Sequence, residues 1–286
     1  MNAFQRKREQ WLGFSFLRLC MAMILFILFV IFYDIITKGI GVINWEFLST
    51  MPRNGMTEGG ILPAIIGTTM VSVLTAIFAI PLGMGCAIYL NEYASDNNFT
   101  RLIRMSIRNL SGVPSIVYGL FGVVLFVQFF HMGTSILSAG CTLGLMTLPW
   151  TITASEEALK SIPRSYREGS LALGATKWQT IRTNVLPYSI PGMLTGTILG
   201  LSRAAGETAP ILFTGAAFYL PVLPDSLSSQ FMALPYHLYI MSTQHHAIEQ
   251  VRPIAYRTAL VLIALVLLIN SFAILLRYQL LKVRKE

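Results

Sequence analysis

The sequence predicts an all-α membrane protein with six transmembrane helices and both termini in the cytoplasm. Three observations lead to this prediction. Hydrophobic residues make up 54% of the 286 residues and charged residues only 12%, whereas a soluble domain carries about 25% charged residues. Six apolar stretches are long enough to cross a bilayer, which takes ~20 helical residues. The basic residues gather between alternate stretches, as in other multi-pass membrane proteins.

The six predicted spans differ in length and spacing. The second and fifth exceed what a bilayer needs, so we expect each to tilt or to include a non-spanning part. The third and fourth are separated by a three-residue turn, which predicts a tight hairpin. No cleavage site follows the first span and "QRKR" precedes it, so it is predicted to be an uncleaved anchor. The spans are 16–36, 61–90, 110–130, 133–153, 190–220 and 257–277.

The orientation follows from the 21 Lys and Arg residues, which outnumber the 13 Asp and Glu residues. Most lie at the two termini and in the loops after the second and fourth spans. The positive-inside rule puts these four regions in the cytoplasm, and an even number of spans requires the same. Because the positive charge marks topology, no nucleic-acid site is predicted. The outer loops hold only Lys38, Arg53, Arg252 and Arg257.

The cytoplasmic loop 155–187 is too polar to span the membrane and too long for a simple turn. Pro163 is expected to begin a short amphipathic helix that Gly174 ends. A second short helix carries Trp178 on its apolar side and is expected to stop at Pro187. Such a pair suits docking of a cytoplasmic partner, and it equally suits an interfacial helix pair lying on lipid.

The fifth span carries two charges, Arg203 and Glu207, in an apolar setting. A charge at the bilayer centre costs roughly 2.5–3.5 kcal/mol on insertion scales. At 100° per residue the two charges continue a stripe of small residues that lets helices approach closely. Both are therefore predicted to face protein or a water-filled path. The stripe is made of Gly192, Gly196 and Gly200.

Two interpretations of this charge pair stay open on the residues alone. In the first, Arg203 and Glu207 form a buried ion pair that locks helix register and binds nothing. In the second, Arg203 lines a translocation path and offers its planar fork of donors to an oxyanion. Glu207 then restrains Arg203 and releases it when the anion arrives, so that binding is transient.

Other candidate residues are weaker. Ser115, beside Pro114, and Thr68, near Pro63, could offer hydroxyl donors at helix bends on the path, or could simply serve packing. The three cysteines lack metal-site spacing and are expected to be buried free thiols. The paired histidines His245 and His246 lack a third ligand, so no metal is predicted and a solvated loop is expected.

The chain carries no phosphate-cradling G-x-x-x-x-G-K-[ST] loop and no identifiable catalytic set, so it is not predicted to be an enzyme. Energy must come from a partner or from an ion gradient. The segment Glu168-Gly169-Ser170-x-x-x-Gly174, followed by Asn184-x-Leu186-Pro187, resembles the "EAA…G…I-LP" coupling motif of ABC importer permeases, with Gly169, Ser170 and Asn184 as departures.

In that family the short helices insert into a cleft on a cytoplasmic ATPase and transmit its closure. The resemblance therefore assigns coupling to residues of this loop. They are Glu168, Gly169, Ser170, Ala172, Gly174 and Ala175.

Further stretches are similar to the PstA-type permeases of phosphate uptake, over roughly 59–275. They include "GGILPAIIGTTM", "LSGVPSIVYGLFG" and "SRAAGETAPILFTG". The resemblance implies a type I, MetI-like importer fold in the bacterial inner membrane. It divides the chain into a cytoplasmic N-terminus (1–15), a first helix with its outer loop (16–58), a permease core (59–278) and a cytoplasmic tail (279–286).

The same resemblance implies partners and an energy source. A PstC-like second permease, two PstB-like ATPase subunits and an extracytoplasmic PstS-like phosphate-binding protein are expected. ATP and Mg are expected on the ATPases, with no cofactor in this chain. Three alternatives stay open: a permease for another oxyanion or small solute, an ATP-independent secondary transporter, and a membrane sensor. A homodimer is a further possibility.

Overall fold

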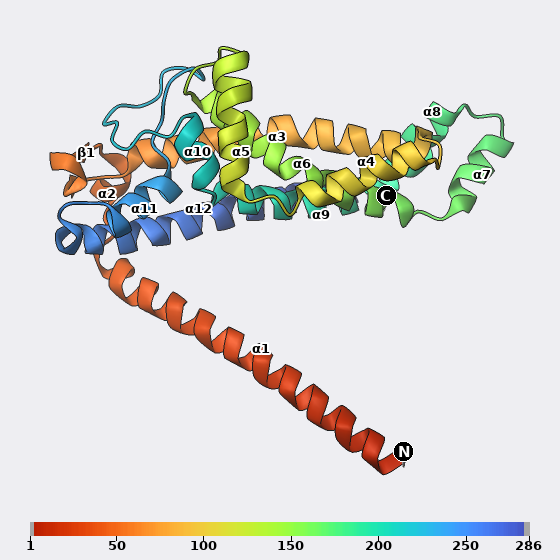
Figure 1. The fold of residues 1–286 in the computed structure, drawn as a ribbon, viewed down its shortest axis with the longest axis horizontal. Coiled ribbons are helices and arrows are strands. Elements are labelled where there is room, and N and C mark those ends of the chain that lie inside the picture. The colour runs from red at the N-terminus through yellow and green to blue at the C-terminus, as the bar shows by residue number, and fades with distance from the viewer. Residues whose placement is uncertain (1–2, 283–286) are drawn as a thin grey trace.

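The computed structural model describes residues 3–282, and it is built from helices joined by short turns and one outer loop (Figure 1). A two-stranded antiparallel sheet in the 52–59 segment pairs Pro52 with Gly59. The elements are α1 (Ala3–Gly39), η1 (Ile40–Val42), α2 (Trp45–Ser49), β1 (Pro52–Arg53), η2 (Asn54–Met56), β2 (Glu58–Gly59), α3 (Leu62–Ile88), η3 (Tyr89–Tyr93), α4 (Asn98–Leu110), α5 (Ser115–Gly122), η4 (Val123–Phe129), α6 (Ile136–Lys160), α7 (Arg164–Ala172), α8 (Lys177–Thr180), η5 (Ile181–Val185), α9 (Leu186–Ala205), α10 (Ala209–Thr214), α11 (Leu234–Thr243) and α12 (Ile248–Lys282).

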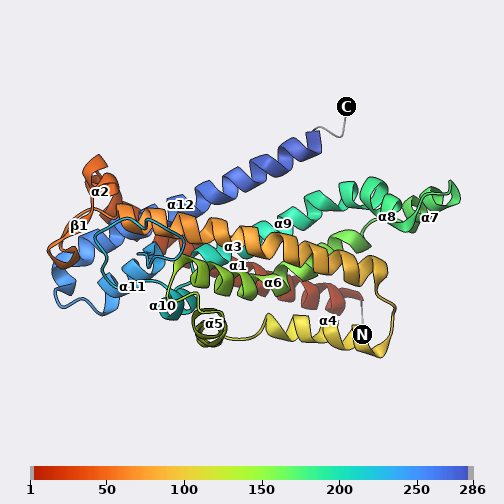
Figure 2. The same ribbon diagram turned by 90° about the horizontal axis from the view of Figure 1, so that it is seen from above.

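Within the described residues, five helical segments are long and apolar enough to cross a membrane, and a bent pair makes a sixth if it counts as one span. This confirms the predicted all-α membrane fold. The helices α3, α6 and α9 lie side by side, and α12 joins them at the outer end (Figures 1 and 2). Helix α1 leaves this bundle at an angle (Figure 1). The tail residues 283–286 lie outside the described residues.

The third span differs from the prediction. The predicted bounds 110–130 begin too early, because residue 110 is the last residue of α4, and a bend considered beside Pro114 is present, since the chain turns by 105° into α5. We refer to residues 111–114 as the elbow. Pro114 causes it, since proline disfavours helical geometry in the residue before it. The predicted hairpin after this span is confirmed, with His131 and Gly133 at positive φ.

The fifth span also has different bounds. Helix α8, the π-turn η5 and α9 form one continuous span from Lys177 to Ala205, so Pro187 does not stop the second short helix. Pro187 lies in the first turn of α9, directly after the π-turn, where a missing N–H is tolerated. The non-spanning part expected for this span is present, because α10 is a separate short helix beyond Gly206.

Small residues set the close approach of the three central helices. A Cβ at Gly196 of α9 would collide with the Cβ of Ala154 on α6, and one at Gly192 would lie 2.9 Å from the Cβ of Ala158. On the other side of α6, Gly140 lies against Leu74 of α3. Backbones that approach this closely gain van der Waals contact, which drives helix association in lipid. The three helices therefore form a rigid frame.

Candidate functional site

Arg203 lies at the C-terminal end of α9, where a positive charge is favoured by the helix dipole. Its Nε donates to Oε1 of Glu207 at 3.2 Å, and the side chains are 53% and 17% exposed. The helix ends at Ala205, so Glu207 reaches Arg203 from the following turn. The helical position predicted for Glu207 is therefore wrong, although the two charges do meet.

The ion pair leaves the outer edge of the Arg203 guanidinium open. In the described part of the chain, neither Nη1 nor Nη2 donates a hydrogen bond. The guanidinium carbon lies 5.8 Å from the centre of the Trp150 ring on α6, which is within range of a cation–π interaction. Arg203 is thus held by the hydrogen bond from its Nε and by the contact of its guanidinium with the Trp150 ring. Its two terminal nitrogens, Nη1 and Nη2, remain free to donate to two acceptor oxygens at once.

A small recess beside Arg203 brings four helices and the elbow together. Its walls come from the end of α4, the elbow, α5, α6 and α9. The predicted glycine stripe allows this close packing. A Cβ atom placed on Gly200 would lie 3.4 Å from the methyl group of Thr147. The recess is lined by Leu110, Ser111, Val113, Tyr118, Met146, Thr147, Trp150, Gly200 and Arg203.

The two hydroxyl candidates lie elsewhere. Thr68 is buried in the outer core, where its hydroxyl donates to the Ala64 carbonyl at 2.7 Å and accepts from the Leu234 N–H at 2.8 Å. Ser115 is half-buried as the first residue of α5, just beyond the elbow residues that line the recess. The structure thus brings together Arg203 and Glu207, and places Thr68 in a packing role in this conformation.

The residues predicted to couple to an ATPase lie on a projecting knob, formed by α7 and α8, at the end of the bundle that is predicted to be cytoplasmic (Figure 1). Helix α7 buries no residue, and Gly174 ends it at φ +83°, a conformation that favours glycine. Glu168, Gly169 and Ala172 are exposed, and Ala175 is half-buried. Ser170 accepts a hydrogen bond from Thr180 of α8 at 3.0 Å. Such an exposed, pre-shaped helix is suited to insertion into a partner.

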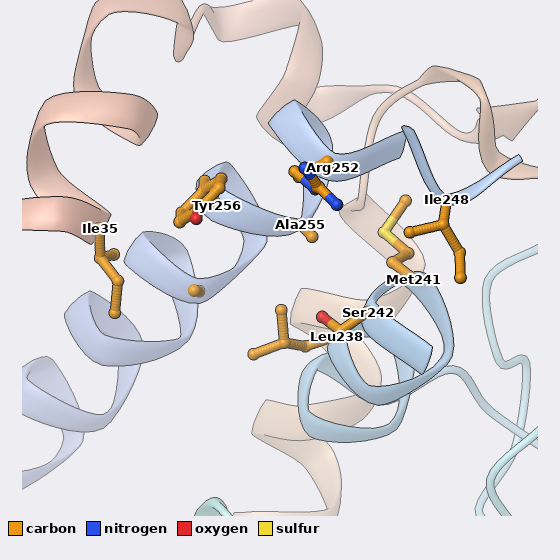
Figure 3. Close-up of a pocket in the computed structure, with 9 residues that line it drawn as sticks. Ile35, Leu238, Met241, Ser242, Ile248, Arg252, Ala255 and Tyr256 are labelled. Carbon is orange, nitrogen blue, oxygen red and sulfur yellow. The ribbon is translucent and has the colours of Figure 1, made fainter. Parts of the chain in front are cut away.

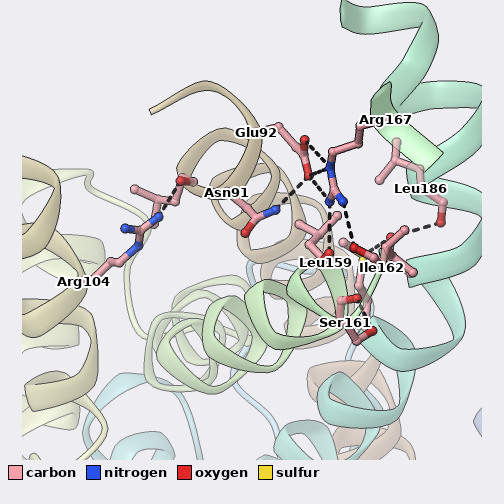
Figure 4. Close-up of polar contacts among 12 residues, drawn as sticks. Asn91, Glu92, Arg104, Leu159, Ser161, Ile162, Arg167 and Leu186 are labelled. Carbon is pink, nitrogen blue, oxygen red and sulfur yellow. Dashed lines mark hydrogen bonds and ion pairs between the residues drawn. The ribbon is translucent and has the colours of Figure 1, made fainter. Parts of the chain in front are cut away.

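Charged contacts at the base of this knob were not foreseen from the sequence. Arg167 of α7 binds Glu92 of η3 through Nη2 at 2.7 Å and through Nε at 3.1 Å (Figure 4). Arg104 of α4 binds Glu156 of α6 at 2.8 Å. From the sequence, the basic residues of these loops indicated topology alone. The available signal was a glutamate at the end of a span that faces a basic loop.

Another unforeseen contact joins α9 to α12 beside Arg203. The Ser202 hydroxyl donates to Oδ1 of Asn270, a polar residue within an otherwise apolar stretch of α12. A side-chain amide in a membrane helix is energetically unfavourable unless it forms a hydrogen bond with another helix. This contact therefore fixes α12 against the end of α9 at the level of the candidate site.

The solvated loop expected for the paired histidines is confirmed for His246, which is exposed in the turn between α11 and α12, and is wrong for His245. His245 is buried and its Nε2 bonds the Gly55 carbonyl at 2.8 Å. His237 on α11 is buried without a hydrogen-bond partner, and burial lowers its pKa to about 4, with His245 adding to the effect. Within residues 3–282, no three His, Cys, Asp or Glu side chains group to hold a metal ion.

A larger cavity of about 290 Å³ opens between α1, α11 and α12 (Figure 3). Its wall is mainly apolar, including Ile35 and Leu238, and its one cation, Arg252, is engaged by Glu249 at 2.8 Å. Such a lining offers few donors to an anion. Arg203 therefore remains the better candidate for anion contact.

Comparison with known proteins identifies the family. Residues 79–285 match the model of the binding-protein-dependent transport system inner membrane component. The chain belongs to this family. It is accordingly a multi-pass membrane permease subunit of an ABC importer, a transport subunit distinct from the ATPase.

Several relatives of the permease are phosphate transport proteins by name. It is 30% identical to PstA 2 of Mycobacterium bovis over 93% of this chain and 87% of the relative. It is 34% identical to a probable PstA of Methanocaldococcus jannaschii, over 85% and 84%. It is also 36% identical to the probable ABC transporter permease YqgI of Bacillus subtilis, over 73% and 71%.

Solved structures share the fold of the permease. A chain of a bacterial alginate importer aligns with a TM-score of 0.68 at 14% identity, covering 96% of this chain and 98% of that one. A chain of the MetNI methionine transporter aligns with a TM-score of 0.63 at 17% identity, over 77% and 95%. The type I, MetI-like importer fold is thereby confirmed.

Proposed function

We propose that this permease passes inorganic phosphate across the bacterial inner membrane and that Arg203 contacts the anion on its way. The observation that carries the proposal is the free fork of Arg203. Its Nε is engaged by Glu207 at 3.2 Å, whereas Nη1 and Nη2 have no partner among the described residues. Two parallel N–H donors match two oxygens of a phosphate. The PstA relatives support phosphate as the anion.

The ion pair suits transport better than tight binding. An unpaired guanidinium in low dielectric would hold an anion strongly, because electrostatic attraction grows as the dielectric constant falls. Glu207 offsets part of the Arg203 charge, and its negative charge also repels the incoming anion. Phosphate that binds the fork is thus held weakly and leaves again. Arg203 therefore speeds passage without trapping its substrate.

Energy for this passage comes from partners in the proposal. Two PstB-like ATPase subunits bind ATP and Mg and clamp the knob formed by α7, and the assembled complex, not this chain, hydrolyses ATP. A PstC-like permease completes the path, and a PstS-like binding protein delivers phosphate from outside. The exposed α7, the coupling-motif residues from Glu168 to Gly174 and the family membership support this arrangement.

The test is phosphate uptake by the assembled complex in proteoliposomes, with ATP supplied to the ATPase side. Arg203→Ala is expected to reduce ATP-dependent uptake by about 100-fold or more, because the fork contact of roughly 1.5–3 kcal/mol is lost together with the charge. Arg203→Lys is expected to recover only a part, since lysine keeps the charge without the fork. Arg252→Ala, at an exposed outer pair, is the matched control and leaves uptake unchanged.

The alternatives give different results in the same vesicles. Uptake that survives without ATP and follows a proton gradient indicates a secondary transporter. Sulfate or molybdate that competes equally with phosphate indicates a general oxyanion permease. Complete absence of transport in the assembled complex, with retained phosphate binding, indicates a sensor. Wild-type uptake by Arg203→Ala contradicts the role of Arg203.

A further inference from the structure

The cytoplasmic end of α3 is held between two arginines from different elements. The π-turn η3 ends this span, and π-turns recur at functional positions. Arg167 of α7 forms an ion pair with the Glu92 side chain of this turn (Figure 4). Arg104 of α4 donates a hydrogen bond to the Leu90 carbonyl of the same turn at 2.7 Å. Neither arginine touches the predicted anion site, so the ion pairs need another explanation.

Arg167 is a rigid attachment. Its Nη1 donates to the Ile162 carbonyl at 3.0 Å and its Nη2 to the Leu159 carbonyl at 3.1 Å, so the C-terminal end of α6 shares the same guanidinium. The Glu92 side chain is only 6% exposed and that of Arg167 20%. Solvent screens such a pair much less than it screens an exposed one. Displacement of α7 therefore carries η3 with it.

Helix α4 continues the connection toward Arg203. Arg104 bonds both Leu90 and Glu156, so α4 follows η3 and α6. Leu110, the last residue of α4, accepts a hydrogen bond from the Tyr118 hydroxyl across the elbow at 2.8 Å. Leu110 and the elbow residues Ser111 and Val113 then form the wall of the recess that faces Arg203.

We propose that Arg167, Glu92 and Arg104 form a relay by which movement of the coupling helix α7 reaches the elbow beside Arg203. A second, direct connection exists, since Ser170 bonds α8 and α8 continues into α9, which carries Arg203. The two connections reach different lining residues of one recess, the elbow and Arg203. Movement of α7 thus shifts the elbow relative to Arg203 and opens or closes the path. Glu92, Arg167 and Arg104 are positioning residues in this scheme, which depends on the proposed coupling to an ATPase.

The relay is tested in the assembled complex after replacement of the native cysteines Cys20, Cys86 and Cys141. Ser111→Cys reports on the elbow through its rate of modification by a water-soluble thiol reagent, with and without bound nucleotide. We expect nucleotide to change this rate in the otherwise unaltered complex. Glu92→Ala is expected to reduce the nucleotide-dependent change to a small fraction, since only the connection through α8 and α9 remains, and to lower phosphate uptake per ATP hydrolysed by roughly tenfold. Glu92→Gln, which keeps the side-chain shape, serves if Glu92→Ala does not assemble.

The matched control is Arg101→Ala, on α4, the helix that also carries Arg104. It removes an exposed ion pair with Asp96, whose side chain lies 3.7 Å from that of Arg101. It is expected to leave both the labelling change and the transport ratio intact. A nucleotide-dependent change at residue 111 that is undiminished when Glu92 is replaced overturns the relay. Failure of the unaltered complex to couple ATP hydrolysis to phosphate uptake contradicts the proposed function itself, so the two failures are distinguishable.

Discussion

Single residues decide where charge is tolerated in this permease. Arg203 keeps a charge within an apolar segment because three neighbouring features lower the free-energy cost of that charge. They are the C-terminal end of α9, the Glu207 carboxylate and the Trp150 ring. Glu92 is similarly kept buried by the guanidinium of Arg167. Removing one partner of such a pair leaves an uncompensated buried charge, which costs more than the pair itself contributes. Arg203 and Glu92 therefore each depend on the oppositely charged residue that contacts them.

His237 gives a prediction at the same scale. Its folded pKa of about 4 lies below the ordinary value of 6.5, so the folded chain binds fewer protons than the unfolded chain between these values. Stability is thus lost as the pH falls from about 6.5 to 4, by up to about 3 kcal/mol. Thermal unfolding of the detergent-solubilised chain at pH 7.5 and pH 5 measures this.

The control for that prediction is His237→Leu, which removes the titrating ring from the same buried position. We expect the loss of melting temperature on acidification to be smaller in this variant than in the wild-type chain. An equal loss in both proteins would show that other groups carry the acid sensitivity.

At the scale of elements, the glycine stripe of α9 fixes the distance to α6. Gly196 faces Ala154, whereas Gly85 on α3 has open space at its would-be Cβ. Gly196→Ala is predicted to destabilise the chain by about 1–3 kcal/mol, because the added methyl group forces the helices apart. Gly85→Ala is expected to be neutral or slightly stabilising. Thermal unfolding in detergent compares the two, and equal stability of both variants would contradict the packing role.

Sequence patterns predicted those elements that are governed by length and hydropathy. The spans around α1, α3, α6 and α12 and the knob ending at Gly174 follow from apolar length and from glycine and proline positions. A bend beside Pro114 was considered from the sequence, but its angle of 105° was not predictable, because apolar residues continue on both sides of it and hydropathy does not record direction. The end of α9 at Ala205 was missed for a similar reason, since the turn through Gly206 keeps the 203–207 spacing that a helix would also produce.

The candidate site was only partly predictable at this scale. Arg203 and Glu207 were recognisable because charges are rare in apolar segments. Trp150, Ser202 with Asn270, and the Arg167–Glu92 pair depend on contacts between elements far apart in the sequence. No spacing rule within one helix can indicate such pairs.

At the scale of the whole molecule, the permease separates a rigid frame from surfaces that have no partner within this chain. The apolar face of α1 is fully exposed in the described residues, and α7 is exposed at the opposite end. A permease built this way requires lipid and other subunits around it. The recess beside Arg203 lies inside the frame, between the elbow and α9, and it is within reach of movement from the cytoplasmic knob.

In the proposed function Arg203 faces an aqueous path for anions, and cysteine accessibility at this position measures that directly. Arg203→Cys is made in an otherwise cysteine-free assembled complex, which is then treated with a membrane-impermeant anionic thiol reagent. We expect this cysteine to react with the reagent, because the side chain at residue 203 is in contact with water. Reaction with a lipid-soluble maleimide alone would contradict the proposal, because residue 203 would then face acyl chains.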